Sequence, residues 1–552
     1  MKVIIIGGVA GGASAAARLR RMDETAEIIL FERGHYISFA NCGLPYYIGD
    51  TIQERAKLLV QTPEKMKNRF NIDVRIDSEV IGIDKAAKTV TVKTADGTYT
   101  ESYDKLVLAP GASPVKHPIP GIDNDNVFTM WSIPDADKVY GYLKNNNVKK
   151  AVVVGGGFVG VEMVENLVDR GVEVTLIEML DQVMNNVDYE IAQWLHMELN
   201  DHGVHLMLSE AIKQIDKTDG ETVITLASGK TVSTDMIVMS AGIKPNTKLA
   251  TDAGLEVGAR GHIIVDKTML TSDPDIYALG DAVEVTNYIS GERIVAALAA
   301  PANKQGRIVA NNITGHADSY EGAQLTSVAK IFNKTVASTG FVEKQLIRQG
   351  KKLHEDYEVI VAHPNNFAGY YPGNSPLHLK VIYDKTTKKL LGAQGCGEAG
   401  TEKRIDVVST AMFYGGTVYD LMRLDLAYAP PYNTAKDPLN FVGFVAENSD
   451  NGLVDIISWK ELEQLDADEF QMIDTRLENE VAEGGYPGSI HIATEDLRTN
   501  LDKLNKDKTI VLYCRSGVRS YIGARFLSQI GYKVKSMAGG WLSYQAYNYK
   551  AI

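Results

Sequence analysis

Cysteine is scarce in this sequence, because only Cys42, Cys396 and Cys514 occur among 552 residues. Their odd number and wide spacing exclude a disulfide framework and a cysteine-rich metal cluster, and we expect no metal site. Each cysteine must therefore be judged singly. We expect reduced thiols in a cytoplasmic protein.

Long apolar runs are also missing. No segment reaches the roughly 18 consecutive apolar residues of a membrane-spanning helix, so no membrane contact is expected. The uncharged stretch between Lys2 and Ala17 imitates a signal peptide, but the glycines from Gly7 to Gly12 interrupt it. Excess positive charge is absent too, and a formal net charge of −13 argues against unassisted binding of nucleic acid.

What the chain does have is length and an ordinary globular composition. At about 100–200 residues per domain, 552 residues allow three to five domains, enough for a catalytic body with an appended module. The sequence is 45% hydrophobic and 23% charged, which is typical of globular proteins and excludes a disordered or fibrous chain.

One pattern occurs twice in the first half of the chain. The β-branched run Val3–Ile6 is followed by the glycine cluster Gly7–Gly12 and an alanine-rich segment, which predicts a strand, a tight turn and a helix. The same order returns at residues 151–160. In each copy the next apolar run ends at an acid, Glu32 in the first and Glu178 in the second. The sequence therefore predicts two nucleotide-binding βαβ units.

The chemistry of a dinucleotide explains this spacing. Its pyrophosphate needs a close backbone and the free amides of a helix N-terminus, and its ribose hydroxyls need an acid at the end of the second strand. The second unit meets every part of that pattern, with Gly155, Gly157, Gly160 and Glu178. In the first unit Val9 stands where the second glycine is expected, so the match is weaker. Glu178 also favours a free 2′-hydroxyl, hence NADH over NADPH.

Three further stretches fit a protein with two dinucleotides. Small residues follow the apolar runs within 106–112 and 239–242, as is required where a chain crosses a cofactor. Asp281 follows a predicted strand at residues 275–279, which suits a polyol hydroxyl. A simple turn at a strand end would explain any one of these stretches alone.

The order of these motifs, with the second unit inserted within the first, resembles the two-dinucleotide flavoprotein reductases over residues 1 to about 447. The resemblance implies an α/β fold with two Rossmann-like units: an FAD-binding domain in two parts (1–115 and 244–324), an NAD(P)H-binding domain (116–243) and an α+β dimerisation domain (325–447). It implies a homodimer with FAD and either NADH or NADPH. It places these cofactors against Gly7, Val9, Ala10, Gly12, Glu32, Arg33, Val80, Ala109, Gly111, Asp281, Gly155, Gly157, Gly160, Glu162, Glu178 and Gly242.

Cys42 lies in the stretch Ser38–Tyr46, ten residues after the first ribose acid. A crossover from strand to helix at this point would place its thiol beside the flavin ring. We expect the N-terminus of that helix to lower the thiol pKa. A lone cysteine is ordinarily a small core residue, but Asn41, Gly43 and Pro45 make a poor core segment.

No second cysteine accompanies Cys42. Reductases of the glutathione reductase type carry one nearby and form an internal disulfide, whereas this chain has Tyr47 five residues on. The other sulfur must then come from the substrate, unless Cys42 cycles as a sulfenic acid. Both mechanisms are open at this point.

Ser38, Cys42 and Tyr46 resemble the signature of the coenzyme A disulfide reductases and NADH-dependent persulfide reductases. In the former the mixed disulfide is with CoA. The resemblance implies that Tyr370 and Tyr428 of the other subunit donate hydrogen bonds to the leaving thiolate and are catalytic with Cys42. It implies CoA contacts at Ser14, Arg18, Arg21, Ser38, Asn41 and Lys436. A basic residue is expected near position 70, where this chain has Phe70.

Two alternatives come from other functional classes. NADH oxidases and peroxidases share the fold and the single cysteine, but a histidine is expected in their first glycine turn, where this chain has Ala10. The second alternative is a redox-sensing sulfur-carrier protein that docks a partner through a persulfide on Cys514. We expect the thiol substrate.

The last hundred residues form a separate module. Residues 447–452 are polar and predict a linker. A strand at 509–513 leads into the six-residue loop Cys514–Arg519, and a helix is expected to begin near Ser520. Successive backbone amides of such a loop point at the cysteine sulfur and stabilise its anion. We expect Arg515 and Arg519 to add positive charge and to contact substrate.

This module resembles an α/β rhodanese domain over about residues 455–552, which implies a catalytic persulfide on Cys514. Cys396 falls in an expected strand of the dimerisation domain and is expected to be structural. Together these features predict NAD(P)H- and FAD-dependent reduction of CoA disulfide, or of persulfides and polysulfides of CoA or a small thiol. The reduction would be coupled to sulfur transfer on Cys514. The substrate, the nicotinamide preference and the order of sulfur transfer are left open.

Overall fold

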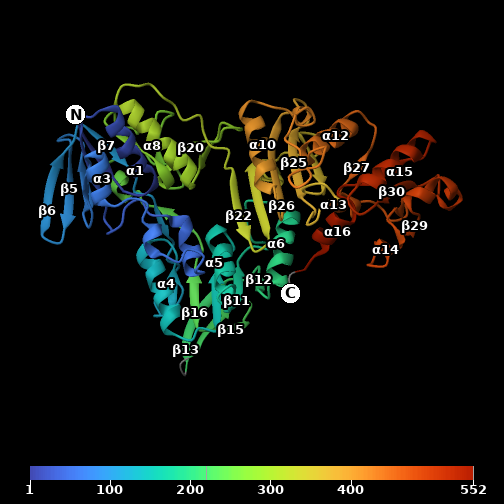
Figure 1. Ribbon diagram of the computed structural model, residues 1–552, viewed down its shortest axis with the longest axis horizontal. Helices are drawn as coiled ribbons and strands as arrows, with labels where there is room; N and C mark the ends of the chain where they lie inside the picture. Colours follow the sequence, from blue (N-terminus) through green and yellow to red (C-terminus); the bar gives the residue numbers. More distant parts are fainter. Residues whose placement is uncertain (219–220, 551–552) are drawn as a thin grey trace. The chain divides into compact units, whose positions relative to one another are not determined.

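A computed structural model describes residues 1–218 and 221–550 of the protein. It divides into two compact units, one made of Met1–Met179 with Ser209–Leu325 and one made of Leu180–Leu208 with Thr326–Ile552 (Figure 1). Among the helices of the described residues, none is long and apolar enough to span a bilayer.

The first unit contains the sheet of the first predicted nucleotide-binding unit. Its order is β19-β7-β1-β2-β3, and every pairing is parallel. The strands are β1 (Lys2–Ile6), β2 (Glu27–Phe31), β3 (Asp73–Arg75), β7 (Lys105–Leu108) and β19 (Ile276–Ala278). Helix α1 (Ala10–Met22) follows β1 and packs against α8 (Ala299–Ile313). Since β19 comes from far downstream, this sheet is assembled from two separated parts of the chain.

The second nucleotide-binding unit is inserted between those parts, as predicted. Strand β10 (Lys150–Val154) pairs in parallel with β11 (Glu173–Glu178) and β16 (Met236–Met239), and β16 pairs with β9 (Val127–Thr129). Helix α5 (Phe158–Val168) connects β10 to β11, and α4 (Ile133–Asn145) packs near β9. Val152 and Val153 are almost wholly buried, because a parallel sheet with helices on its faces is shielded on both sides.

Smaller elements complete the first unit. Its other helices are η1 (Asn41–Gly43), α2 (Leu44–Ile48), η2 (Arg55–Leu58), α3 (Pro63–Phe70), α7 (Lys248–Asp252) and η3 (Gly280–Ala282). Its other strands are β4 (Glu79–Asp84), β5 (Thr89–Thr94), β6 (Gly97–Ser102), β8 (Ala112–Pro114), β13 (Ile212–Thr218), β14 (Glu221–Leu226), β15 (Thr231–Thr234), β17 (Ile243–Pro245), β18 (Ile263–Ile264), β20 (Val283–Thr286) and β21 (Arg293–Val295).

The second compact unit, Leu180–Leu208 with Thr326–Ile552, is built on two sheets. The first is antiparallel, in the order β22-β23-β26-β25-β24, with helices α6 (Tyr189–Asp201) and α10 (Thr401–Phe413) packed on it. Its strands are β22 (Ser327–Ile331), β23 (Lys334–Gly340), β24 (Tyr357–Ala362), β25 (His378–Asp384) and β26 (Leu390–Gly397). The same compact unit also contains β12 (His205–Leu208), α9 (Glu343–Arg348), α11 (Val418–Leu421) and α12 (Pro438–Asp450).

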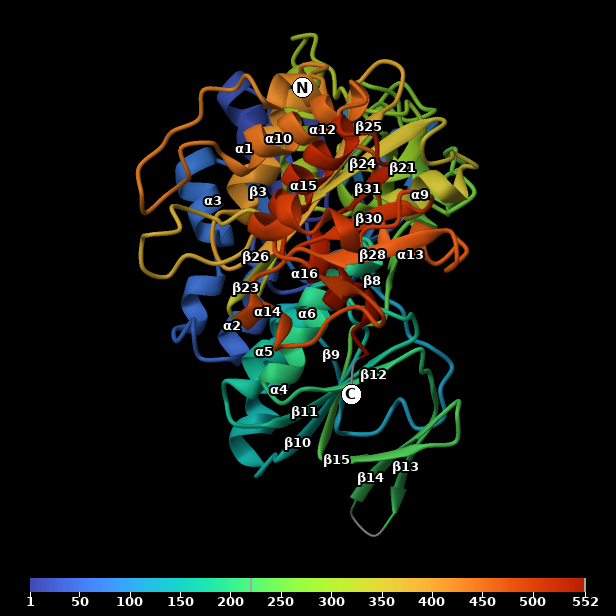
Figure 2. The ribbon, with the colours of Figure 1, turned by 90° about the vertical axis from the view of Figure 1, so that its right-hand side faces the viewer.

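The second sheet belongs to the C-terminal module, residues 453–550. Its pairings are all parallel, in the order β27-β31-β30-β28-β29, and Figure 2 shows β30 between β31 and β28. The strands are β27 (Ile456–Ile457), β28 (Phe470–Asp474), β29 (Ile490–His491), β30 (Thr509–Tyr513) and β31 (Val534–Met537). The helices are α13 (Trp459–Leu462), α14 (Glu478–Val481), η4 (Thr494–Thr499), η5 (Leu501–Lys503), α15 (Val518–Gln529) and α16 (Gly540–Asn548).

The predicted linker at residues 447–452 is wrong for its first four positions. These residues form the last turn of α12, which ends at Asp450. Tyr419 Oη and Lys388 Nζ both donate to the Asp450 carboxylate, at 2.7 Å each. Tertiary hydrogen bonds therefore keep a polar segment helical where its composition alone favours a loop.

The helix expected near Ser520 begins slightly earlier, at Val518. Gly517 precedes it in a left-handed conformation, with φ of +110°. That conformation strains any residue with a Cβ, so the glycine determines where the loop turns into α15.

Candidate functional sites

The first glycine turn joins β1 to α1 through a very close approach of the backbone. Gly7 has φ of +102°, and a Cβ on Gly12 would collide with the carbonyl oxygen of Gly7. The residue that caps α1 is Val9, whose side chain cannot accept a hydrogen bond from the first-turn amides. A narrow turn before amides that lack a side-chain cap suits the pyrophosphate of a dinucleotide.

The second glycine turn repeats this geometry between β10 and α5. Gly155 has φ of +103°, and a Cβ on Gly160 would collide with its carbonyl oxygen. A Cβ on Gly157 would meet no protein atom within 4 Å, because this glycine faces open space at the start of α5. The absence of a side chain at Gly157 therefore leaves room for a ligand. At Gly160 the absence of a side chain allows the helix to pack against the backbone of Gly155.

The two predicted ribose acids lie at these turns. Glu32 accepts hydrogen bonds from Gly8 N at 3.0 Å and from Gly34 N at 2.9 Å. Glu178 accepts one from Gly156 N at 2.6 Å. Carboxylate oxygens have further lone pairs for hydroxyl donors. The residues of both turns therefore fit a dinucleotide each.

The other predicted cofactor positions lie on several elements of the first compact unit. Asp281 lies in η3 directly after β19, and burial raises the pKa of its carboxyl group. Arg33 Nη2 donates to Ser113 Oγ at 3.4 Å. Gly111 and Gly242 both have positive φ, of +64° and +90°. Ala109 follows β7 and Val80 lies in β4.

Cys42 lies in η1 and is exposed. Protein atoms around it nevertheless penalise the anion, so burial raises the pKa of the thiol, and the carboxylates of Glu162 and Asp281 raise it further. The prediction that the protein's own groups lower the pKa of the Cys42 thiol is therefore wrong. Cys42 is followed only by the end of η1 and by α2, which has five residues. So short a helix has too weak a dipole to stabilise the thiolate strongly.

Glu162 and Tyr46 form one group with Cys42, and no local sequence pattern predicts this group. Tyr46 Oη donates to Glu162 Oε1 at 3.4 Å. Burial raises the pKa of Glu162 to about 7. Burial and then the charge of Glu162 raise the pKa of Tyr46 to about 12, so the phenol keeps its proton. The available signal was the pair of acids, Glu162 and Glu165, in the mainly apolar helix after the glycine turn.

The predicted CoA contacts in the first compact unit lie on α1 and in the segment that leads to Cys42. Ser14, Arg18 and Arg21 share one face of α1 by their spacing. The Ser14 hydroxyl donates to Asn303, and Arg18 Nε donates to Asn311 Oδ1 at 2.9 Å. Near Cys42, Ser38 has φ of +42° and Asn41 Nδ2 donates to the carbonyl of Trp131 at 3.2 Å. Lys436, of the second unit, precedes α12.

The two tyrosines predicted to act on the leaving thiolate lie together in the second unit. Tyr370 and Tyr428 are hydrogen-bonded through their hydroxyls at 3.1 Å. Their exposed fractions are 76% and 49%. Their place in the site of another subunit stays a prediction.

In the loop Cys514–Arg519, called the Cys514 loop below, the backbone amide of Gly517 reaches the cysteine sulfur. Gly517 N donates to Cys514 Sγ at 3.1 Å, and α15 begins directly afterwards. Cys514 is only 1% exposed. The amide of Gly517 would stabilise a negative charge on this sulfur.

One loop cation is already engaged. Arg519 Nη2 forms an ion pair with Glu480 Oε2 of α14 at 2.7 Å. Arg519 therefore adds less positive charge to the loop than the sequence predicts, whereas Arg515 is exposed.

A buried network under the loop was not predicted either. Arg476 forms an ion pair with Asp474 at 2.7 Å, and Tyr513 Oη donates to the same carboxylate at 2.7 Å. Tyr513 is the last residue of β30, so this network fixes the strand that leads to Cys514.

Cys396 lies in β26 and is wholly buried, which raises the pKa of its thiol to about 12. A thiol that neither ionises nor meets solvent has no means of reacting. Its structural role, expected from the sequence, fits this position.

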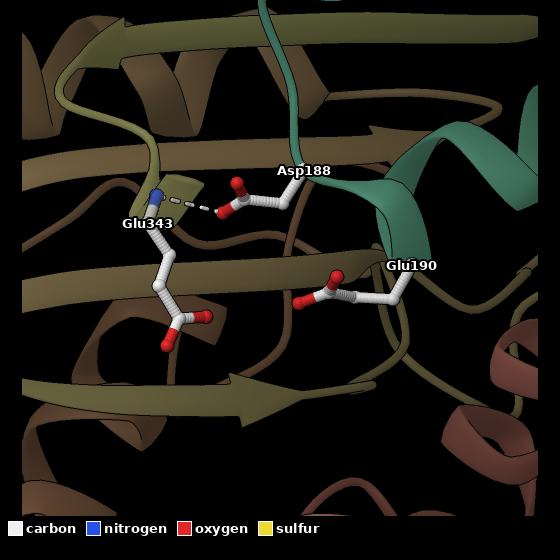
Figure 3. A group of neighbouring side chains, drawn as sticks. All are labelled: Asp188, Glu190 and Glu343. Carbon is white, nitrogen blue, oxygen red and sulfur yellow. Dashed lines mark hydrogen bonds between the residues drawn. The ribbon is translucent and has the colours of Figure 1, made fainter. Parts of the chain in front are cut away.

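An acidic group in the second unit resembles a metal site by geometry alone. Asp188, Glu190 and Glu343 point toward one another (Figure 3). The ammonium of buried Lys380 contacts all three, at 2.9 Å from Asp188 and 2.6 Å from Glu343. Burial lowers the pKa of Lys380, but the carboxylates outweigh that effect and raise it. The lysine thus supplies the cation of this group.

Comparisons with known proteins agree with this geometry. Residues 1–306 match the pyridine nucleotide-disulphide oxidoreductase family, residues 326–438 its dimerisation domain, and residues 458–547 the rhodanese-like domain. A coenzyme A disulfide reductase of Staphylococcus aureus (strain JH9) is 37% identical over 450 residues, which are 81% of this chain and 100% of the relative.

Two solved structures are similar over almost the whole chain. Reduced Bacillus anthracis CoADR-RHD is 47% identical with a TM-score of 0.95, over 99% of this chain and 98% of that one. A NAD-dependent persulfide reductase from A. fulgidus is 39% identical with a TM-score of 0.93, over 99% of this chain and 100% of that one. The resemblance and the fold class expected from the sequence are confirmed.

Proposed function

The chain belongs to the pyridine nucleotide-disulphide oxidoreductase family, and we propose that it uses NADH and FAD to reduce CoA disulfide and small-thiol persulfides at Cys42. The names of its relatives, a coenzyme A disulfide reductase and a persulfide reductase, support this substrate class. The observation that carries the proposal is one exposed thiol, Cys42, beside Glu162 and Tyr46 in the unit that holds both glycine turns.

In this proposal Glu32 and the turn at Gly7–Gly12 hold FAD, and Glu178 and the turn at Gly155–Gly160 hold NADH. When bound, FAD would supply the relay that carries an electron pair from NADH to a disulfide on Cys42. The free 2′-hydroxyl that Glu178 favours is the reason for NADH.

Cys42 performs the sulfur chemistry. Its thiolate attacks one sulfur of CoA disulfide, the S–S bond breaks, and one CoA leaves as a thiol after taking a proton. Two electrons then cleave the mixed disulfide between Cys42 and the second CoA. The balance is NADH + H⁺ + CoA disulfide → NAD⁺ + 2 CoA thiols. For a persulfide RSSH it is NADH + H⁺ + RSSH → NAD⁺ + RSH + H₂S.

Tyr46 and Glu162 hold protons beside this thiol. Tyr46 keeps its proton because its pKa is raised to about 12, and Glu162, with a pKa near 7, exchanges one close to neutral pH. We propose that Tyr370 and Tyr428 donate hydrogen bonds to the leaving thiolate in the partner's site of a homodimer. The predicted CoA contacts, Lys436 among them, would bind CoA there.

The Cys514 loop supplies the substrate in this proposal. A sulfane-sulfur donor transfers one sulfur atom to the Cys514 thiolate, and a small thiol then accepts it as RSSH. The Cys42 thiolate attacks the sulfur of RSSH that bears R, the S–S bond breaks and hydrogen sulfide leaves after taking a proton. Two electrons from NADH then cleave the mixed disulfide, which releases RSH and regenerates Cys42. Since all three cysteines are free, the cytoplasm is a suitable location.

Cysteine variants test both halves of the proposal. We expect Cys42→Ser to abolish NADH oxidation with CoA disulfide and with CoA persulfide. We expect Cys514→Ser to lose only the activity that requires thiosulfate together with CoA. Cys396→Ala is the matched control and should keep all three activities. The coupled scheme is wrong if Cys514→Ser equals the native protein with every sulfane donor.

Reduction of oxygen or peroxide in place of a thiol substrate is the outcome that would contradict the proposed function. NADH turnover in air without any thiol, together with a sulfenic acid on Cys42, would identify an oxidase instead. The mass of the adduct on Cys42 as isolated separates the two, because additions of CoA, sulfur and oxygen differ plainly.

A further inference from the structure

The first turn of α16 supports the Cys514 loop through its backbone. Trp541 N donates to the carbonyl of Cys514 at 2.7 Å, and Leu542 N donates to that of Arg515 at 3.0 Å. A Cβ on Gly540 would collide with the Cys514 carbonyl, so the turn and the loop are in direct contact. A displacement of this turn therefore moves the loop.

The same turn is held from outside the module by His363, which directly follows β24. The Ser543 hydroxyl lies 2.8 Å from His363 Nε2, within hydrogen-bond distance. A Cβ on Gly539 would come within 2.6 Å of the same nitrogen, so the imidazole lies against the start of α16. His363 is 7% exposed, and water has little access to the contact.

His363 is held by His378, which is in turn stacked on Trp194. Its Nδ1 lies 2.9 Å from Nδ1 of His378, the first residue of β25. The ring of Trp194, from α6, stacks on His378 with 3.6 Å between centroids and 6° between planes. The position of Ser543 is thereby tied to a sheet and a helix outside the module.

Both histidines are neutral under ordinary conditions. Burial lowers the pKa of His363 to about 3 and lowers that of His378 as well. Each neutral imidazole carries one N–H, so two tautomer arrangements satisfy the chain. Either His363 donates to His378 and accepts from Ser543, or His378 donates to His363, which donates to Ser543. The contact with Ser543 is a hydrogen bond in both.

We infer that His363 is a positioning residue for sulfur transfer: through Ser543 it holds the first turn of α16, and with it the Cys514 loop, in place. The inference rests on the proposed chemistry of Cys514. The distance that matters is the 3.1 Å between Gly517 N and Cys514 Sγ, because that amide stabilises the sulfur anion. The sulfur chemistry of the module thus depends on a residue of the dimerisation part.

Variants of the full-length, FAD-loaded protein test this inference. Ser543→Ala removes one hydroxyl, His363→Ala removes the ring, and His363→Gln keeps a polar group near the position of Nε2. We expect Ser543→Ala and His363→Ala to slow sulfur transfer from thiosulfate to cyanide by about two- to tenfold, the usual effect of one hydrogen bond. We expect His363→Gln to restore at least half of the native rate.

Two controls separate positioning from general damage. Ser528→Ala makes the same chemical change at an exposed site on α15 and should have the native rate. NADH-dependent reduction of CoA disulfide should be native in every variant. If His363→Ala also loses this activity through misfolding, Ser543→Ala decides the question, because its change is smaller.

Hydrogen–deuterium exchange tests the same point without relying on activity. We expect the amides of residues 514–519 to exchange several-fold faster in Ser543→Ala and His363→Ala than in the native protein. Native exchange together with native transfer in Ser543→Ala would overturn the inference and leave the proposed function intact. If the native protein transfers no sulfur, that part of the proposed function fails, and the exchange rates still decide the role of His363.

Discussion

Two carboxyl groups near Cys42 oppose the ionisation that its proposed chemistry requires. Glu162 has the larger effect on the thiol, and its own pKa of about 7 makes its charge depend on pH near neutrality. The Cys42 thiolate is therefore favoured when Glu162 holds a proton. Protonation of Glu162 and ionisation of Cys42 are linked, because each makes the other more favourable. A proton that leaves the thiol is therefore held more readily by the Glu162 carboxylate.

Replacement of Glu162 by glutamine should lower the pKa of Cys42, because it removes a nearby negative charge. The difference should be largest above pH 7, where the native carboxyl group is ionised. The measurement is the pH dependence of iodoacetamide alkylation of Cys42, followed by peptide mass. Asp169→Asn, at the exposed end of the same helix, is the control. Identical profiles for Glu162→Gln and the native protein would contradict this linkage.

At the residue scale, the sequence predicted groups that carry their own local pattern. The glycine turns, their acids and the Cys514 loop are all recognisable within a few residues. The contact of Tyr46 with Glu162 joins residues 116 positions apart, and no local pattern contains it. The ion pair between Arg519 and Glu480 escaped prediction for the same reason.

A comparison of two glycines tests the second nucleotide turn at the scale of one element. Gly157→Ala should raise KM for NADH by about tenfold with an unchanged melting temperature, because its Cβ enters only the space a ligand would use. Gly160→Ala should instead lower the melting temperature, because its Cβ collides with Gly155. NADH kinetics and thermal unfolding measure the two effects. An unchanged KM in Gly157→Ala would exclude this turn as the NADH site.

Lys380 fastens the start of α6 to β25. Its replacement by methionine leaves three carboxylates without their cation, and we expect a loss of about 3–5 kcal/mol in the free energy of unfolding. Denaturant unfolding measures this loss. The triple variant Lys380→Met, Asp188→Asn, Glu343→Gln should recover part of it, since the buried charges are then removed together. A single variant as stable as the native protein would show that the ammonium contributes nothing.

The helices and strands of the nucleotide-binding units were predictable because apolar periodicity and glycine turns mark their ends. The end of α12 was not, because residues 447–450 are polar and read as a linker. Asp450 stays helical through bonds to Tyr419 and Lys388. Elements held by distant side chains are therefore the ones that local composition misassigns.

At the scale of the whole molecule, His354 connects the antiparallel sheet region to the C-terminal module. Its Nδ1 lies 2.6 Å from Glu358 and its Nε2 lies 2.8 Å from Glu461, which also caps α13. Hydrogen bonds to Glu358 and then Glu461 raise the pKa of His354 to about 10.

This contact gives the attachment of the module a dependence on pH. A raised histidine pKa contributes stability that is fully present below the unfolded value of about 6.5 and is lost as the pH rises toward 10. We therefore expect hydrogen exchange in α13 to accelerate between pH 6.5 and 10, beyond its intrinsic change. His354→Gln should lack this extra acceleration, and equal pH dependence in both proteins would refute the role of the contact.

The domain order was predictable from motif order, whereas the attachment of the module to its own chain was not. The residues that make it, His354 and His363, belong to no recognised motif. They were invisible until the fold brought them to Glu461 and Ser543.

The stacked pair of Trp194 and His378 under His363 also has an evolutionary consequence. In a reductase that lacks the C-terminal module, Ser543 is absent and nothing from α16 covers this surface. An imidazole that is neutral only because it is buried would then face water and titrate near pH 6.5. Lineages that lost the module, or never gained it, should therefore carry hydrophilic replacements at positions 194, 363 and 378, and those replacements would record the history of the fusion.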